Sequence, residues 1–194
     1  MKISSTRRIV MTAILSAVSA VLMFLNFTLP FVPSYLKIDF SEFPALLASF
    51  SLGPLSGAAV CFVKNFINVF SSSTGGVGEL SNFILGVLFT VPAGIYYSKH
   101  RNLKGAVVAA VLGMAFMTVA SFFTNKFLVY PAYTLIMPVE AIVGMSSAII
   151  PSIDSVTKVI LIFNVPFTAV KGLLNVLITF LLYKRISPIL QGRR

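Results

Sequence analysis

The segment 164–182, NVPFTAVKGLLNVLITFLL, constrains the fold more than any other part of the chain. It is apolar and long enough to cross a bilayer as one helix, which takes about 20 residues. Four polar side chains interrupt it, at spacings of i, i+4, i+7 and i+11: Asn164, Thr168, Lys171 and Asn175. At about 3.6 residues per turn, this spacing places all four on one face of the helix.

The lysine in this stripe indicates a function. Inserting a lysine near the centre of a membrane helix costs about 2.5–3.5 kcal/mol, so it is expected to face a protein interior or a wet cavity. The alternative is a lysine that extends along the helix to reach the interface. Lys171 argues against that alternative because it lies well before the basic end of the segment at Lys184 and Arg185. We therefore predict that the stripe binds or transports a ligand.

Composition places the whole chain in the membrane. The 194 residues are 57% hydrophobic and 10% charged, whereas soluble domains carry about 25% charged residues. The apolar runs are long and do not alternate, which favours helices over a β-barrel. The chain is too short for two membrane domains, so residues 1–194 are predicted to form a single membrane-embedded domain.

The sequence lacks the residues that several kinds of chemistry require. With one cysteine, Cys61, and one histidine, His100, the sequence supports no His/Cys metal site. No Walker A motif is present, so ATP hydrolysis by that route is excluded. The acidic residues show no spacing that forms a recognisable catalytic motif, and we predict no catalytic residues. The net charge of +10 reflects basic residues at helix ends, which is a topology signal and not a nucleic-acid surface.

The apolar runs predict an all-α integral membrane bundle of six transmembrane helices. Their ranges are 7–28, 43–52, 54–70, 79–98, 105–129 and 156–183, with Gly53-Pro54 as the tight turn between the two shorter ones. The connection 29–43 is apolar and long, as is typical of a lid. The longest connection, 130–156, is expected to hold a short amphipathic helix within 138–148.

Charge then orients the bundle. Six spans put one set of basic residues on the same side: Lys2, Arg7, Arg8, Lys99, Arg101, Lys104, Lys184, Arg185, Arg193 and Arg194. By the positive-inside rule this side, with both termini, is cytoplasmic. Every acidic residue is predicted on the outer side: Asp39, Glu42, Glu79, Glu140 and Asp154.

The polar intramembrane residues converge in the outer halves of the spans. Glu79 opens the fourth, Asn125 lies near the outer end of the fifth, and Thr168 and Lys171 lie in the outer half of the sixth. The inner halves are apolar, so we expect a pocket open to the outside and not a continuous pore. Amides and hydroxyls beside aromatic residues suit a flat ligand with a polar edge.

Two further clusters allow two interpretations each. Lys64 and Asn68 share a helix face and either bind ligand or hydrogen-bond neighbouring helices. In the first span a set of small residues would let another helix approach closely, either from a partner or within the bundle. They are Ala13, Ala17 and Ala20, with Ser16.

Five motifs, in this order and spacing, resemble one family over nearly the whole chain. They are YLKIDFSEFPALLASFSLGPLSG, KNFINVF, GVGELSNFILG, TNKFLVYPAY and VPFTAVKGLLN. The chain resembles the substrate-binding S components of energy-coupling factor (ECF) transporters, most closely the riboflavin-specific RibU family. The resemblance implies a six-helix protein of the prokaryotic plasma membrane that captures riboflavin as substrate, with no cofactor. It also implies partners: the scaffold subunit EcfT and two ABC ATPases.

The resemblance also assigns residues. Those expected to bind the substrate are Leu36, Gly78, Glu79, Asn125, Thr168 and Lys171, and those expected to dock on the scaffold are Ala13, Ala17 and Ala20. Thr168 departs from the family pattern, in which asparagine is usual after Pro-Phe. A threonine keeps a donor and an acceptor but has a shorter reach.

Other functions remain open at this level. One is an S component for FMN or another vitamin, since several lysines could tolerate a phosphate. A second is a stand-alone carrier, against which the sequence shows no internal inverted repeat. A third is a membrane enzyme, which the absence of a catalytic motif disfavours.

Overall fold

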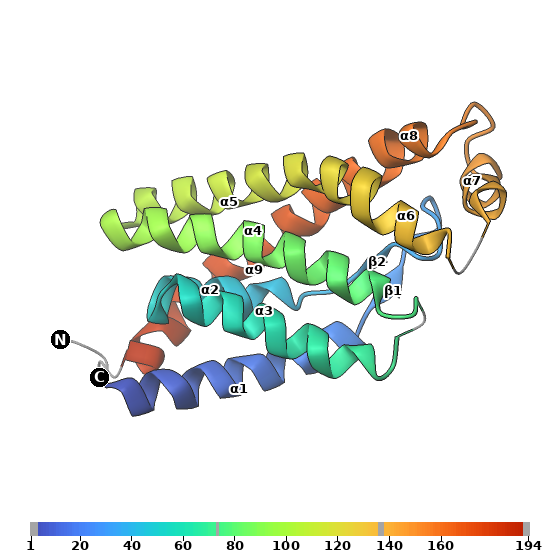
Figure 1. The fold of residues 1–194 in the computed structure, drawn as a ribbon. Coiled ribbons are helices and arrows are strands. Elements are labelled where there is room, and N and C mark those ends of the chain that lie inside the picture. Colours follow the sequence, from blue (N-terminus) through green and yellow to red (C-terminus); the bar gives the residue numbers. More distant parts are fainter. Residues whose placement is uncertain (1–3, 73, 136–137, 192–194) are drawn as a thin grey trace.

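The computed structural model describes residues 4–72, 74–135 and 138–191, with side chains through Tyr183. In chain order its elements are α1 (Ser5–Phe24), β1 (Phe27–Thr28), β2 (Lys37–Ile38), α2 (Glu42–Leu52), α3 (Pro54–Val69), α4 (Val77–Lys99), α5 (Leu103–Thr124), the π-helical segment η1 (Asn125–Val129), α6 (Tyr130–Tyr133), α7 (Val139–Ser147), α8 (Val156–Val159), the π-helical segment η2 (Ile160–Asn164) and α9 (Val165–Gln191). The helices form an elongated bundle (Figure 1).

The protein is a multi-pass membrane protein. Four continuous helical stretches are long and apolar enough to cross a bilayer: Ser5–Phe24, Val77–Lys99, Leu103–Tyr133 and Val156–Tyr183. The remaining two predicted spans, α2 and α3, have 11 and 16 residues and are shorter than a bilayer needs. The expected break between them is confirmed, because Gly53 turns the chain at φ 110° and Pro54 opens α3. The described residues therefore support four spans by length, not six.

The short helix α2 forms the centre of the bundle. All of its residues are buried, and it packs against α1, α3, α4 and α9. Its sequence, EFPALLASFSL, is apolar or small on every side, and a helix that is hydrophobic all round is one that other helices enclose. The surrounding helices therefore shield α2 from the lipid.

The first connection departs from the prediction of an all-α fold. β1 and β2 pair as a short antiparallel ribbon, with Phe27 opposite Ile38 and Thr28 opposite Lys37. This pairing ends α1 at Phe24 and not at residue 28 as predicted. After β2 the chain enters the bundle, where Asp39 is 4% exposed and Glu42 is 1% exposed. These two carboxylates, predicted on the outer side, are therefore buried among the helices and not part of a solvated loop.

The two π-helical segments share a cause in the sequence. η1 ends two residues before Pro131, and η2 ends two residues before Pro166. A proline has no N–H for the regular ladder, so the helix must adjust before it, and a widened turn is one such adjustment. The helix that begins at Leu103 therefore continues past the predicted end at residue 129 to Tyr133.

The predictions for the long connection 130–156 are confirmed in part. The short helix predicted within 138–148 is α7, and the predicted start of the last span at residue 156 is confirmed by α8. Both elements lie at the end of the bundle that carries the β ribbon (Figure 1).

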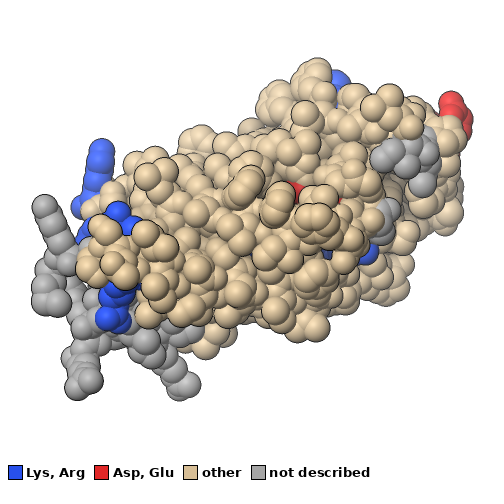
Figure 2. All heavy atoms as spheres, turned by 60° about the horizontal axis from the view of Figure 1, so that its bottom comes forward, with Lys and Arg blue, Asp and Glu red and all other residues tan. Residues whose placement is uncertain are grey.

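Charged side chains are unevenly distributed along the bundle. The start of α1 and the end of α9 lie at one end (Figure 1), where Figure 2 shows a group of basic side chains, while the other end carries acidic side chains together with some basic ones. The exposed basic residues at helix ends on the side where α1 starts are Arg8, Lys99, Arg101 and Lys104. Lys2, Arg193 and Arg194, and the side chains of Lys184 and Arg185, lie outside the described residues. Glu140 and Asp154 are exposed on and after α7.

The small residues of α1 do not form one exposed face. Ala13 and Ala17 are exposed, whereas Ala20 is 4% exposed. The carbonyl of Ala20 accepts a hydrogen bond of 3.4 Å from Asn68 of α3, which shows that α3 covers α1 at this level. Ala20 is therefore a packing residue, and the predicted docking surface is reduced to Ala13 and Ala17.

Lys64 of α3 has a structural role. Its side chain is fully buried, and Nζ lies 2.5 Å from Glu42 Oε1 and 2.7 Å from Ser41 Oγ. Gly86 of α4 makes room for this pair, since a Cβ there would lie 2.9 Å from Glu42 Oε2. The ion pair thus fastens the start of α2 to α3, and Asn68, on the same face, bonds backbone carbonyls.

We predict that Lys64→Met strongly destabilises the protein. Removing one partner of a buried ion pair leaves the other charge buried alone, which costs about 3–5 kcal/mol. The control is Lys158→Met, which breaks the exposed pair with Asp154 and should barely change the melting temperature in detergent. Equal melting temperatures for the two variants would show that the buried pair does not stabilise the fold.

Candidate binding site

One cavity brings together all six residues predicted to bind substrate. Leu36, Gly78, Glu79, Asn125, Thr168 and Lys171 all line it. The cavity lies where α1 and α3 end and α4 begins, at the opposite end of the bundle from the start of α1. Its empty volume, counted together with the open solvent at its mouth, is about 1190 Å³.

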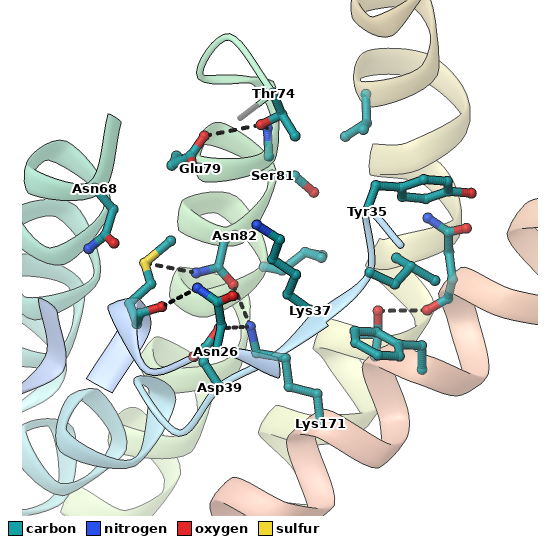
Figure 3. A pocket seen from close by; sticks show the side chains of 18 of the residues that line it. Asn26, Tyr35, Lys37, Asp39, Asn68, Thr74, Glu79, Ser81, Asn82 and Lys171 are labelled. Carbon is teal, nitrogen blue, oxygen red and sulfur yellow. Dashed lines mark hydrogen bonds and ion pairs between the residues drawn. The ribbon is translucent and has the colours of Figure 1, made fainter. Parts of the chain in front are cut away.

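One wall of the cavity carries charge. Lys171 Nζ lies 2.8 Å from Asp39 Oδ2 and donates a hydrogen bond of 3.0 Å to Asn82 Oδ1, and Figure 3 shows the three side chains converging. The ammonium group has three protons, so it retains one for a ligand. The lysine predicted to face a cavity therefore does so, but as half of an ion pair.

The Asp39 carboxylate is held on both oxygens. Oδ1 accepts hydrogen bonds from the backbone N–H and the hydroxyl of Ser41, while Oδ2 faces Lys171. Burial by itself would raise the pKa of this carboxyl. Attraction to the Lys171 and Lys64 ammonium groups, together with these hydrogen bonds, outweighs burial and holds the pKa below its usual range. Asp39 is therefore an anion that stabilises the charge of Lys171.

Asn175 fixes the segment that carries Asp39, although it does not line the cavity. Its Oδ1 accepts a hydrogen bond of 2.8 Å from the Phe43 N–H, and its Nδ2 donates to the Asp39 carbonyl at 3.2 Å. The last residue of the predicted polar stripe thus binds backbone and not ligand. It joins α9 to the entry of α2.

A second part of the cavity wall is neutral. Asn125 and Asn164 line it and hydrogen-bond each other at 3.0 Å. The Thr168 hydroxyl donates to the Asn164 carbonyl at 2.8 Å. Its single proton is used there, so towards a ligand Thr168 can only accept. Tyr35, which is labelled in Figure 3, and Tyr133 add aromatic surface to the lining.

The mouth is shaped by a hydrogen-bonded turn before α4. Glu79 Oε2 accepts hydrogen bonds from Ser72 at 2.6 Å and from Thr74 at 3.3 Å. The Gly78 N–H donates to Thr74 Oγ1 at 3.0 Å, and a Cβ on Gly78 would lie 2.7 Å from that oxygen. Glu79 and Gly78 are therefore held by their own turn.

Several lining residues were not among the six predicted ones, and two of these, Asn82 and Asp39, hold Lys171. Asn82 follows Glu79 by three positions on α4 and thus shares its face, a signal that could have found it. Asp39 had no such signal, because its partner Lys171 lies 132 positions away. Within the part of the chain that the structure describes, no three His, Cys, Asp or Glu side chains group to hold a metal ion.

The comparisons with known proteins assign the family. Residues 7–183 match the model of the substrate-specific component of ECF transporters. A riboflavin transporter of Bacillus subtilis, FmnP, is 34% identical over 97% of this chain and 96% of its own. The riboflavin transporter RibU of Staphylococcus aureus is 31% identical over 98% and 96%. The chain belongs to the substrate-specific S components of ECF transporters.

The fold agrees with this assignment. A solved structure of the S component of a bacterial ECF transporter superposes with a TM-score of 0.76 at 31% identity. The match covers 97% of this chain and 99% of that one.

We predict that Asn175→Leu destabilises the protein. The change leaves the buried Phe43 N–H without a partner, at a cost of about 1–3 kcal/mol. Thr179→Val is the matched control, since the buried Thr179 hydroxyl bonds only a carbonyl of its own helix. Thermal unfolding in detergent should separate the two variants, and a larger loss for Thr179→Val would contradict the role given to Asn175.

Proposed function

We propose that the protein is the riboflavin-binding S component of an ECF-type importer and that the cavity is its binding site. The observation that carries the proposal is the meeting of six substrate-contact candidates around one cavity in a chain whose relatives are named riboflavin transporters. The walls suit the ligand, because a flavin is flat and apolar in its middle and has hydrogen-bonding groups along one edge and along its sugar chain. Aromatic and aliphatic groups would cover the ring, and the amides would bind the edge.

The charge around the cavity favours a ligand without a phosphate. The described charged residues at the cavity wall, with the Lys64 that pairs with Glu42, are three basic and three acidic: Lys37, Lys64, Lys171, Asp39, Glu42 and Glu79. A phosphate carries about −1.5 to −2 charges near pH 7 and needs positive charge around it. The balanced wall supports riboflavin as the ligand over FMN.

The rest of the proposal concerns assembly. We infer that the protein lies in the plasma membrane with both termini in the cytoplasm, as its basic end indicates. It would bind and not chemically change its substrate, and would depend on EcfT and two ABC ATPases for release. Ala13 and Ala17 are exposed on α1, where small side chains would let a scaffold helix approach closely.

Purified protein in mild detergent tests the proposal directly. Its visible absorption spectrum should show bound flavin, and titration of stripped protein with riboflavin should quench the flavin fluorescence at a one-to-one ratio. FMN is titrated in parallel and should bind more weakly. A colourless preparation with no quenching by riboflavin would rule out riboflavin as the substrate. Tighter binding of FMN than of riboflavin would make FMN the preferred ligand.

We expect Lys171→Ala to weaken riboflavin binding at least about tenfold, because a hydrogen bond to a charged group contributes about 1.5–3 kcal/mol. The measurement is the same fluorescence titration on protein whose melting confirms that it is folded. Lys126→Ala is the control, since Lys126 is exposed and lies over the Phe122 and Phe127 rings, outside the cavity. Unchanged riboflavin affinity in folded Lys171→Ala would show that Lys171 does not bind the ligand and serves only in its ion pair with Asp39.

We expect Ala13→Leu and Ala17→Leu to abolish transport and leave riboflavin binding intact, since larger side chains would block close approach of a scaffold helix. The measurement is riboflavin uptake into vesicles that hold the whole complex. The control is Ala115→Leu, at an exposed position of α5, which should transport normally because α5 lies on the opposite side of the bundle from α1 (Figure 1). Uptake by the lone chain would indicate a stand-alone carrier instead.

A further inference from the structure

A chain of side-chain hydrogen bonds runs from the cavity mouth to α5. The Tyr35 hydroxyl lies 3.1 Å from the Tyr130 hydroxyl, which donates to Asn164 Oδ1 at 2.9 Å. Asn164 Nδ2 donates to Asn125 Oδ1 at 3.0 Å, and Asn125 Nδ2 donates to the Ser121 carbonyl at 2.7 Å. These residues come from the first connection, α6, η2, η1 and α5.

Every bond in this chain has the same direction, and the Ser121 carbonyl sets it. A carbonyl oxygen only accepts, so Asn125 must turn its amide nitrogen towards it and its oxygen towards Asn164. Asn164 must then turn its nitrogen to Asn125 and its oxygen to Tyr130. The single proton of the Tyr130 hydroxyl goes to that oxygen, which leaves Tyr35 as the donor to Tyr130.

Tyr130 supports the orientation of Asn164 from behind the cavity wall. Asn125, Asn164 and Tyr35 line the cavity, whereas Tyr130 does not and is 3% exposed. Tyr130 donates to the oxygen of Asn164, while Asn125 accepts from its nitrogen. Without the Tyr130 donor, only the contact with Asn125 favours this orientation, so the amide is held less strongly and the flipped orientation becomes more accessible.

We propose that Tyr130 is a positioning residue that, together with the Ser121 carbonyl, fixes which hydrogen-bonding groups the cavity wall presents to its ligand. Beyond the chain, Asn125 and Asn164 each keep one N–H and one acceptor lone pair for the ligand. With their orientations fixed, the wall presents one pattern of donors and acceptors. This inference rests on the proposed function, because it takes the ring edge of riboflavin, with its N3–H donor between two carbonyl acceptors, as the group that the amides recognise.

Selectivity tests the inference more sharply than affinity. Riboflavin and N3-methylriboflavin, which lacks the N3–H donor, are titrated into wild type and into Tyr130→Phe. A fixed wall should bind the methylated compound at least tenfold more weakly than riboflavin. In Tyr130→Phe the riboflavin affinity should fall several-fold, and the ratio between the two ligands should shrink to threefold or less, since the less firmly held amide of Asn164 can adapt to either edge.

Tyr97→Phe is the matched control. Tyr97 is also a buried tyrosine, its hydroxyl lies 2.7 Å from that of Tyr183, and it is outside the cavity lining. The same substitution there should lower the melting temperature by a comparable amount and leave both affinities and their ratio unchanged. If Tyr130→Phe acted only by loosening the fold, Tyr97→Phe would change the two affinities and their ratio in the same way.

The outcomes separate the two claims. If wild type binds riboflavin and the ratio is the same in wild type and Tyr130→Phe, Tyr130 does not position the amides and the inference is overturned. A wild type that binds both ligands equally would also overturn it, because the amides would then not recognise the N3 edge. If wild type binds no riboflavin, the proposed function fails and the inference fails with it.

Discussion

The buried pairing of two carboxylates with two lysines at the start of α2 is the interaction on which the rest of the structure depends. Asp39 and Glu42 enter the bundle on a connection that carries polar backbone, and such a segment is stable there only if its charges and N–H groups find partners. Lys171, Lys64 and Asn175 supply them from α9 and α3. This pairing lets a loop form the cavity floor and lets the short α2 lie wholly inside.

The same pairing prepares the site. Lys171 is oriented by Asp39 and Asn82 before any ligand arrives, and the amides of Asn125 and Asn164 are oriented by the Ser121 carbonyl and Tyr130. A cavity whose donors and acceptors are already fixed loses less freedom when it binds a ligand. The charged part and the neutral part of the cavity wall are each held in place by residues behind them. Such a preorganised site suits a protein that captures its substrate.

Several features of the fold were predictable because they are local. The break at Gly53-Pro54, the short helix within 138–148 and the last span from residue 156 each follow from turn residues and apolar runs. The predicted site residues also met around one cavity, since polar residues in apolar helices have few favourable places to face. The docking face was predicted less well, because Ala20 is buried by α3, a contact that helical spacing alone does not reveal.

By itself the sequence determined the membrane class, the approximate helices and the polar stripe, because periodicity and hydrophobicity act over a few turns of chain. Only the tertiary structure decided that Asp39 and Glu42 lie inside, that α2 is enclosed and that Asn175 binds backbone. It also decided that Tyr130 lies behind the cavity wall. Each of these depends on partners between 22 and 136 positions apart in the sequence, and contacts at that range are fixed by helix packing, which no local pattern records.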